Sequence, residues 1–297
     1  MNNIQGRNYL IIINPRSGNG FEGNKSEKIK DYLEENKVSF EIKKTEKRGD
    51  AEDFAKNGAK QGFTHIISVG GDGTSSEIVN AIHDADVVFS IIPNGSGNDF
   101  PRALCIPRDF DSALRNIVIG KELDVDIGKF RDRYFINGLG IGLDGAVAKR
   151  FKHLKVFGAF AGYLIGAVIE AFMFKGFYAM LSSDGKVYEN NFILLGASNG
   201  PTQGGIRLAP GASVSDNLLD IHLIENMNFF KRLITLSRAL SADHVGREGV
   251  KILKLEKAEL TVNESIPGHM DGEIFVLEKG VYSITLLKNR LKVLVPQ

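Results

Sequence analysis

The chain has 297 residues, of which 43% are hydrophobic and 25% are charged, and its formal net charge is +1. This length exceeds the usual size of one domain, so we expect two domains with a cleft between them. The composition is that of an ordinary globular protein, which excludes a disordered or fibrous chain. The balanced charge gives no global field that would attract nucleic acid, and no nucleic-acid partner is predicted.

Local features indicate where the protein works. The single cysteine, Cys105, excludes an internal disulfide and a cysteine-based zinc site, and it fits a reducing compartment. Residues 1–13 enter an apolar run without a charged leader, which is not typical of a signal peptide. The most apolar stretch begins at Val156, but Glu170 interrupts it before it is long enough to span a bilayer. A cytoplasmic protein without a transmembrane helix is predicted.

The first 125 residues repeat one pattern: an apolar run, a turn and an amphipathic segment, which is typical of βα units on a parallel sheet. We predict strands at 9–14, 39–43, 65–69 and 87–92, and helices at 22–35, 50–61 and 75–82. Glycine-rich turns follow three of these strands, at 15–20, 70–74 and 93–99. Because ligands bind outside the carboxyl ends of parallel strands, we expect the three turns to meet at one site.

After about residue 123 the pattern changes to short apolar or alternating runs separated by turns, which predicts an antiparallel β-sandwich. The predicted strands are 133–138, 177–182, 191–197, 219–224, 258–262, 273–277 and 282–287, with helical insertions at 145–175 and 228–241. The last run, 291–295, either closes the sandwich or returns to the first domain. The predicted domains are therefore 1–125 and 126–288, followed by residues 289–297.

The turn at 70–74 suits a phosphate and a cation. Glycines at the start of a helix let backbone N–H groups approach a phosphate closely. A plain strand-to-helix turn also needs glycines, but it has no use for Asp72. A carboxylate beside a phosphate requires a cation, which favours phosphate with Mg²⁺. The P-loop pattern and a first-turn G-x-G-x-x-G are both absent, so neither a P-loop NTPase nor a dinucleotide-binding Rossmann domain is supported.

Five segments of the chain resemble motifs of one known family, and they occur in the same order as in that family. They are IINPRSGNG (12–20), GGDGTSSEIVNAI (70–82), PNGSGNDFPRAL (93–104), DVDIG (124–128) and MDGE (270–273). Together they resemble the diacylglycerol kinase catalytic domain, which bacterial diacylglycerol kinases share with phosphatidylglycerol kinase-like proteins and with sphingosine and ceramide kinases. GGDGT also occurs in NAD kinases, whereas the 93–104 segment has the lipid-kinase form. The resemblance implies a three-layer α/β domain, an antiparallel β-sandwich and an active site in the cleft between them.

The same resemblance implies roles for individual residues. Asp72 positions Mg²⁺, and the 270–273 segment supplies the general base, which is either Asp271 or Glu273. Ser96 stands where many relatives have threonine, and both residues supply a hydroxyl. The implied ATP-binding residues are Asn14, Pro15, Arg16, Ser17, Gly18, Thr45, Gly70, Gly71, Asp72, Gly73, Thr74, Ser75, Ser76, Glu77, Gly95, Ser96 and Asn98.

A further resemblance covers residues 207–224, where the family holds a structural Mg²⁺. It implies the Asp216 carboxylate and the backbone carbonyls of Ser213 and Leu218 as ligands. Asn217 replaces the glycine that is usual in the family, and asparagine tolerates a left-handed backbone better than most residues. From the residues alone, a plain Asp-Asn turn before a strand is the favoured explanation of this segment.

The expected function is an ATP-dependent lipid kinase that uses ATP and Mg²⁺ to phosphorylate a lipid hydroxyl, with diacylglycerol as the favoured acceptor. The alternatives are another lipid (phosphatidylglycerol, a sphingoid base or a polyprenol), a soluble acceptor such as NAD, and a non-catalytic nucleotide or lipid sensor. The six histidines show no metal-ligand spacing, so zinc is not expected, and His269 is interpreted as a hydrogen-bonded structural residue.

Peripheral contact with the inner face of the membrane is predicted at 149–177. This segment begins with the cations Lys149, Arg150, Lys152 and Lys155 and with His153, and continues into an apolar run. Such a pattern suits docking on an anionic leaflet, and it suits a core helix with a solvated entry equally well. A homodimer is also compatible with exposed sandwich strands.

Overall fold

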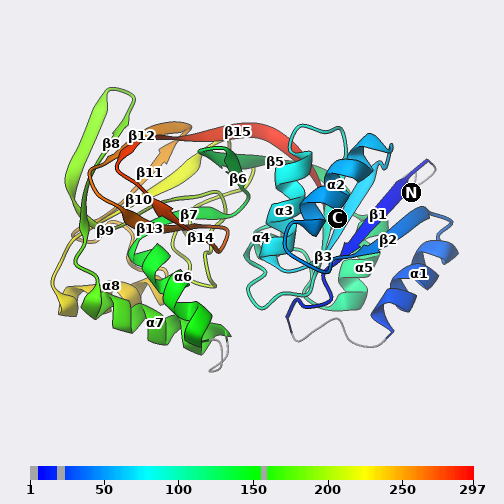
Figure 1. Cartoon of the computed structure of the whole chain (residues 1–297), viewed down its shortest axis with the longest axis horizontal. Coiled ribbons are helices and arrows are strands. Elements are labelled where there is room, and N and C mark those ends of the chain that lie inside the picture. Colours follow the sequence, from blue (N-terminus) through cyan, green and yellow to red (C-terminus); the bar gives the residue numbers. More distant parts are fainter. Residues whose placement is uncertain (1–5, 19–23, 155–158) are drawn as a thin grey trace. The chain divides into compact units, whose positions relative to one another are not determined.

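The computed structural model describes residues 6–18, 24–154 and 159–297, without the side chains of 151–154 and 159–160. Asn19, Gly20 and Lys155 therefore lie outside the described residues, as do the side chains of Lys152 and His153. The chain divides into two compact units (Figure 1). Unit 1 comprises Met1–Val125 and Asn289–Gln297, and unit 2 comprises Asp126–Lys288.

Unit 1 is an α/β domain with a parallel sheet, as the sequence predicts. The strands β1 (Asn8–Ile13), β2 (Ser39–Lys44), β3 (His65–Gly70) and β4 (Val88–Pro93) run in the order β4-β3-β1-β2. Every residue of β3 and β4 is buried, which requires helices on both faces of the sheet.

The helices of unit 1 provide that cover (Figure 1). They are α1 (Lys25–Glu35), α2 (Asp50–Lys60), α3 (Asp72–Ile82), the short α4 (Asp99–Ala103) and α5 (Phe110–Ile119). On one face α1 lies beside α5, where Lys25 Nζ is 5.8 Å from the centre of the Phe110 ring. On the other face α2 packs against α3.

The final strand, β15 (Gly280–Val295), belongs to both units. Its first part pairs with β12 (Lys257–Val262) in unit 2. Near its end, Lys292 and Val293 pair in parallel with Val88 and Phe89 of β4. Asn116 Nδ2 of α5 also donates a hydrogen bond to Leu294 O at 3.1 Å. The last run therefore returns to the first domain, a choice that the sequence leaves open.

Unit 2 is an antiparallel β-sandwich, again as the sequence predicts. One long strand, β9, joins its two sheets because residues 186–192 pair with β8 and residues 194–198 pair with both β7 and β10. The remaining strands of this part of the chain are β5 (Lys121–Phe130), β6 (Arg133–Phe135), β7 (Gly138–Gly142), β8 (Phe177–Ser183), β9 (Lys186–Ser198), β10 (Leu219–Glu225), β11 (Val250–Leu255), β13 (Ile266–Met270) and β14 (Glu273–Leu277). Of these strands, β5, β11 and β13 are not predicted from the sequence, and the strand predicted at 133–138 covers β6 but only the first residue of β7.

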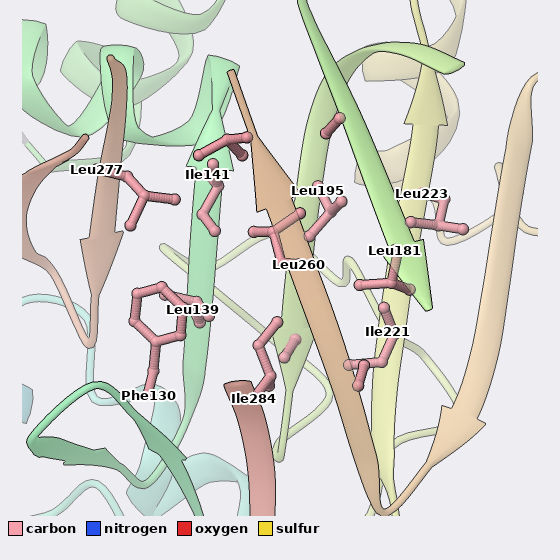
Figure 2. Close-up of a cluster of buried hydrophobic side chains, with 14 of the residues drawn as sticks. Phe130, Leu139, Ile141, Leu181, Leu195, Ile221, Leu223, Leu260, Leu277 and Ile284 are labelled. Atoms are coloured by element: carbon pink, nitrogen blue, oxygen red, sulfur yellow. The ribbon is translucent and has the colours of Figure 1, made fainter. Parts of the chain in front are cut away.

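The core of unit 2 lies between the two sheets (Figure 2). Leu139, Leu195, Ile221 and Leu260 come from four different strands, and each is at most 1% exposed. Burial of apolar surface on this scale is the main stabilising contribution to such a sandwich.

The helices of unit 2 are α6 (Leu143–Leu154), α7 (Ala159–Met173) and α8 (Phe229–Leu240), so the insertion predicted at 145–175 forms two helices. Arg232 of α8 donates hydrogen bonds to Ala171 O and Phe174 O, at 2.9 and 2.5 Å, at the end of α7. These carbonyls have no partner further along the helix, so the guanidinium caps α7 and ties it to α8. Within the described residues, no helix is both long and apolar enough to cross a bilayer.

Candidate active site

The three glycine-rich turns of unit 1 contact one another. Asn14 Nδ2, after β1, donates a hydrogen bond to Thr74 Oγ1 at the start of α3, at 3.0 Å. Asn94 Nδ2, after β4, donates to Ser17 Oγ at 2.9 Å and to Ser17 O at 3.1 Å. The predicted meeting of these turns at the carboxyl ends of the strands is therefore present in the structure.

Glycine is required where the turns touch. A Cβ added to Gly95 would lie 2.5 Å from the Cα of Gly71, so the turns at 70–74 and 93–99 approach backbone to backbone. Gly18 has a φ of +61°, and a Cβ there would overlap Asn94 O. With little side-chain volume between them, the turns at 15–18, 70–74 and 93–99 bring their backbones together, and we call this arrangement the glycine cradle. Close backbone approach at the start of a helix is what a nucleotide phosphate requires.

Asp72 is the first residue of α3, next to the positive end of the helix dipole. Its Oδ1 accepts a hydrogen bond from Phe100 N at 3.3 Å. A Cβ on Gly97 would lie 2.8 Å from Asp72 Oδ2 and 3.9 Å from Asp99 Oδ2, so both carboxylates border Gly97. Asp99 is buried, and Arg102 Nη1 donates to its Oδ1 at 2.8 Å. The sequence analysis did not single out Asp99, although it lies within the 93–104 segment.

Several predicted ATP-binding residues shape the turns. The Asn98 amide donates to Gly95 O at 2.7 Å and accepts from Gly95 N at 3.0 Å. Ser75 is buried, with its hydroxyl 3.1 Å from Ser68 Oγ of β3. Glu77 Oε2 accepts from Gly49 N at 3.1 Å, which holds the turn before α2. These side chains act on the protein's own backbone or core.

The other predicted residues lie in or beside the cradle. Thr45 is buried, and its backbone N–H donates to Ile13 O at 2.9 Å. Asn14 Oδ1 accepts from the backbone N–H of Arg16 at 3.0 Å, which closes the first turn. Arg16, Gly73 and Ser96 are exposed, Pro15 is partly buried, and Gly70 and Ser76 are buried.

In unit 2, the 270–273 segment forms the hairpin between β13 and β14. Met270 pairs with Glu273, and the two residues between them have positive φ angles, +47° for Asp271 and +82° for Gly272. Such a two-residue loop favours Asp-Gly because both positions need a left-handed backbone. The hairpin places Asp271 at the turn and Glu273 at the start of β14.

The two carboxylates of the hairpin differ in their surroundings. Asp271 Oδ1 accepts from the backbone N–H groups of Asn137 at 3.0 Å and Gly138 at 2.9 Å, and Oδ2 accepts from Ile136 N at 2.9 Å. Burial raises the pKa of Asp271 above its usual value, and these three donors act against that rise. Its carboxylate therefore fastens the hairpin to the start of β7. Glu273 is partly buried.

A buried contact between a histidine and a carboxylate lies beside the hairpin. His269 Nε2 is 2.8 Å from Asp144 Oδ2, and the Tyr163 hydroxyl donates to Asp144 Oδ1 at 2.5 Å. Gly272 N donates to His269 Nδ1 at 3.4 Å. Burial acts to raise the pKa of Asp144, but His269 and Tyr163 outweigh it, so the pKa is lowered. His269 is thus a hydrogen-bonded structural residue, as the sequence analysis expects.

The predicted structural Mg²⁺ segment lies elsewhere in unit 2, before β10. Asn217 has a φ of +63°, so it adopts the left-handed turn expected of it. Asp216 Oδ2 lies 2.9 Å from the ammonium Nζ of Lys254, which also donates to Asp220 Oδ2 at 2.9 Å and to Gly211 O at 3.1 Å. A cation supplied by the protein thus already contacts the main predicted ligand, so this donor set does not fit an additional Mg²⁺.

Comparison with known proteins agrees with this architecture. Residues 8–130 match the diacylglycerol kinase catalytic domain, and residues 138–294 match the YegS C-terminal NAD kinase beta sandwich-like domain. The chain is 30% identical to the diacylglycerol kinase of Bacillus subtilis (strain 168), over 89% of this chain and 88% of the relative. It is 31% identical to that of Staphylococcus carnosus (strain TM300), over 89% and 87%.

Solved structures show the same fold. A crystal structure of a diacylglycerol kinase from Bacillus anthracis str. Sterne superposes with a TM-score of 0.75 at 23% identity, covering 97% of both chains. A second structure from that organism superposes with a TM-score of 0.81 at 25% identity, again over 97% of both chains.

The α/β unit with its glycine cradle, the β-sandwich with its carboxylate hairpin and these matches define a two-domain kinase. The chain belongs to the diacylglycerol kinase family. As a member of that family it is an ATP-dependent lipid kinase, as the sequence analysis expects.

Proposed function

We propose that this chain transfers the γ-phosphate of ATP to the free hydroxyl of diacylglycerol, giving phosphatidic acid and ADP. The observation that carries this proposal is the glycine cradle of unit 1, in a chain that matches relatives named diacylglycerol kinase along nearly its whole length. The rival acceptor NAD is disfavoured because residues 8–130 match the diacylglycerol kinase catalytic domain.

ATP would lie with its phosphates on the backbone of the three turns. Among the described residues, no atom lies within 4 Å of a Cβ added to Gly73, so the side-chain position is open here in the first turn of α3, at the positive end of the helix. Asp72, whose Oδ2 borders Gly97, is the oxygen ligand that would hold the Mg²⁺ accompanying ATP. Mg²⁺ there would neutralise the charge that develops on the transferred phosphoryl group.

Of the two candidate bases, the contacts favour Glu273. A general base must accept the proton of the lipid hydroxyl while the hydroxyl oxygen attacks the γ-phosphorus and ADP leaves. Three backbone N–H groups already donate to the Asp271 carboxylate, so its oxygens are committed to holding the hairpin. We therefore assign the base to Glu273 and hairpin positioning to Asp271.

Two expectations stay predictions. One is the cleft between the domains. The other is the homodimer, which size-exclusion chromatography would test.

Membrane contact is proposed for the outer face of α7 and α8, because a lipid substrate must be taken from a bilayer. Phe172 and Phe230 are each 74% exposed, although large apolar side chains are normally covered. The Phe172 ring packs edge-on against Phe229 of α8, with ring centres 5.5 Å apart, so the two helices present one apolar surface. Arg238 is exposed on α8 and would meet anionic headgroups, whereas the Lys231 ammonium is paired with Glu248 Oε1 at 3.0 Å.

The structure changes the role of one cation in the membrane contact predicted at 149–177. Arg150 Nε is 2.5 Å from Glu170 Oε1, so this cation is paired within the protein and joins α6 to α7. Lys149 is exposed, and the remaining predicted basic side chains lie outside those that the structure describes. The proposed contact therefore combines Lys149 with the apolar face of α7 and α8 and Arg238 of α8.

The test is transfer of radiolabelled γ-phosphate from ATP and Mg²⁺ to lipids in mixed micelles. The panel contains diacylglycerol, phosphatidylglycerol, a sphingoid base and a polyprenol, with NAD as the soluble control. Label on diacylglycerol supports the proposal, and label on another lipid corrects the acceptor. Label on NAD alone contradicts it, whereas ATP binding without any transfer favours a sensor.

A further inference from the structure

Lys254 places an ammonium group among the acidic residues of unit 2. In the antiparallel pair of β10 and β11, Lys254 stands directly opposite Asp220. Its Nζ bridges Asp220 Oδ2 and Asp216 Oδ2, at 2.9 Å each, and also contacts Gly211 O. The Asp220 side chain is only 4% exposed, so this carboxylate needs a compensating cation.

The rest of this loop is held by hydrogen bonds. Asp216 Oδ1 accepts from Leu218 N at 3.2 Å, so both oxygens of this carboxylate have donors. Asn217 N donates to Asp126 Oδ2 at 2.8 Å, and Asp126 N donates to Val214 O at 2.7 Å. The turn that carries the predicted metal ligands is thus fixed by groups of the chain itself.

We propose that the Lys254 ammonium replaces the structural Mg²⁺ implied by the family resemblance, so that unit 2 of this chain folds without a divalent cation. A Mg²⁺ bound to Asp216 would lie about 2.1 Å from a carboxylate oxygen. If it shared Oδ2 with the ammonium, the two cations would be at most about 5 Å apart and would repel each other. The ammonium also contacts two carboxylates and a carbonyl oxygen, which are the groups that a bound cation would contact.

The test uses the nucleotide-free full chain and follows thermal unfolding by calorimetry in EDTA and in millimolar Mg²⁺ or Ca²⁺. For the unmodified protein the two midpoints should agree within about 1 °C. Lys254→Met leaves Asp216 and Asp220 without their ammonium, so the midpoint in EDTA should fall by about 5 °C or more. Mg²⁺ or Ca²⁺ should restore much of this loss, because the vacated carboxylates become a divalent-cation site.

Two further variants sharpen the comparison. Lys251→Met removes a cation from the same strand, where Lys251 Nζ lies over the Tyr188 ring at 5.1 Å, and it should create no response to Mg²⁺. Lys254→Arg keeps a cation between the carboxylates and should stay insensitive to EDTA.

Several results would overturn the proposal. One is a midpoint of the unmodified protein that falls on chelation. Another is about one Mg²⁺ per chain retained after dialysis into metal-free buffer and counted by mass spectrometry. A Lys254→Met protein with an unchanged midpoint and no response to Mg²⁺ would also contradict it. If Lys254→Met does not fold, two measurements still test the proposal: the Mg²⁺ content of the unmodified protein and the effect of EDTA on the midpoint of Lys254→Arg. None of these readouts depends on kinase activity, so this proposal and the proposed function can fail separately.

Discussion

Glu273 and Asp271 stand two residues apart, and substitution should separate their roles. Glu273→Gln removes the proposed base and keeps the shape of the side chain. We expect kcat to fall by about 100-fold or more with unchanged ATP affinity, because the base acts on the lipid hydroxyl and not on the nucleotide. Steady-state lipid phosphorylation and calorimetric ATP titration check this.

Asp271→Asn should instead affect stability. The new amide replaces a carboxylate that accepts three backbone hydrogen bonds, and its NH₂ group would face an N–H donor. We expect the free energy of unfolding to fall by about 1–3 kcal/mol in urea titrations. If both variants keep near-normal turnover with unchanged ATP affinity, neither carboxylate is the base.

Two glycines of the cradle should respond differently to alanine. In Gly95→Ala the new methyl group would collide with Gly71, so we expect a loss of about 1–3 kcal/mol of stability together with weaker ATP binding. In Gly73→Ala the new methyl group would meet no atom of the described residues within 4 Å, and it should not destabilise the protein because alanine is the better helix former. Weaker ATP binding by this stable variant would place the phosphates on the start of α3, and unchanged binding would contradict that placement.

His222 makes stability depend on pH. Burial lowers the pKa of His222 from 6.5 to about 4. Between these pH values the imidazole stays neutral in the folded protein but is protonated in the unfolded chain. Stability is therefore lost as pH falls from 6.5 towards 4, and this histidine contributes a loss of about 2 kcal/mol at about pH 5. Urea titrations should show that the free energy of unfolding changes less between pH 6.5 and about pH 5 in His222→Gln than in the unmodified protein. An NMR titration of native His222 near its ordinary pKa would refute this account.

Among the elements, α7 and α8 carry the proposed membrane contact. The double variant Phe172→Ser with Phe230→Ser removes two exposed aromatic rings, so binding to vesicles containing phosphatidylglycerol should weaken several-fold in cosedimentation. Val281→Ser is the matched control, since Val281 of β15 is also exposed but lies outside this face. Equal vesicle binding by the unmodified protein, the double variant and Val281→Ser would show that α7 and α8 do not form the membrane contact.

For the whole molecule, β15 makes unit 1 depend on the end of the chain. Ending the chain at Asn289 removes four buried apolar residues, Leu291, Val293, Leu294 and Val295. Each contributes about 1.5–3 kcal/mol, so their sum approaches the stability of a typical domain. We expect loss of ATP binding in calorimetry and a partial loss of circular dichroism. A chain ending at Val295 should retain both, and ATP binding by the shorter chain would show that unit 1 folds without this strand.

Local sequence patterns determined much of this protein. Apolar runs with glycine-rich turns predict β1, β3 and β4 and their shared ligand edge, because strand periodicity and turn chemistry are short-range properties. The Asp-Gly pair likewise predicts a tight hairpin at 271–272. The strands β5, β11 and β13 are not among the predicted strands. In β13, Pro267 and Gly268 are unfavourable strand residues, and the neighbouring strands decide its pairing. In β5, apolar and polar residues alternate over 123–128 after Gly120, so this strand carries a signal that could have been used.

Only the tertiary structure decided the contacts between residues far apart in the chain. The return of β15 to β4 depends on strand partners about 200 residues away, and hydropathy alone fits either placement. The different surroundings of Asp271 and Glu273 arise from N–H groups more than 130 residues earlier in the chain. Lys254 meets Asp216 and Asp220 because β10 pairs with β11 in one register. Sequence thus determined which chemical groups the chain contains, and folding decided which of them came within hydrogen-bonding distance.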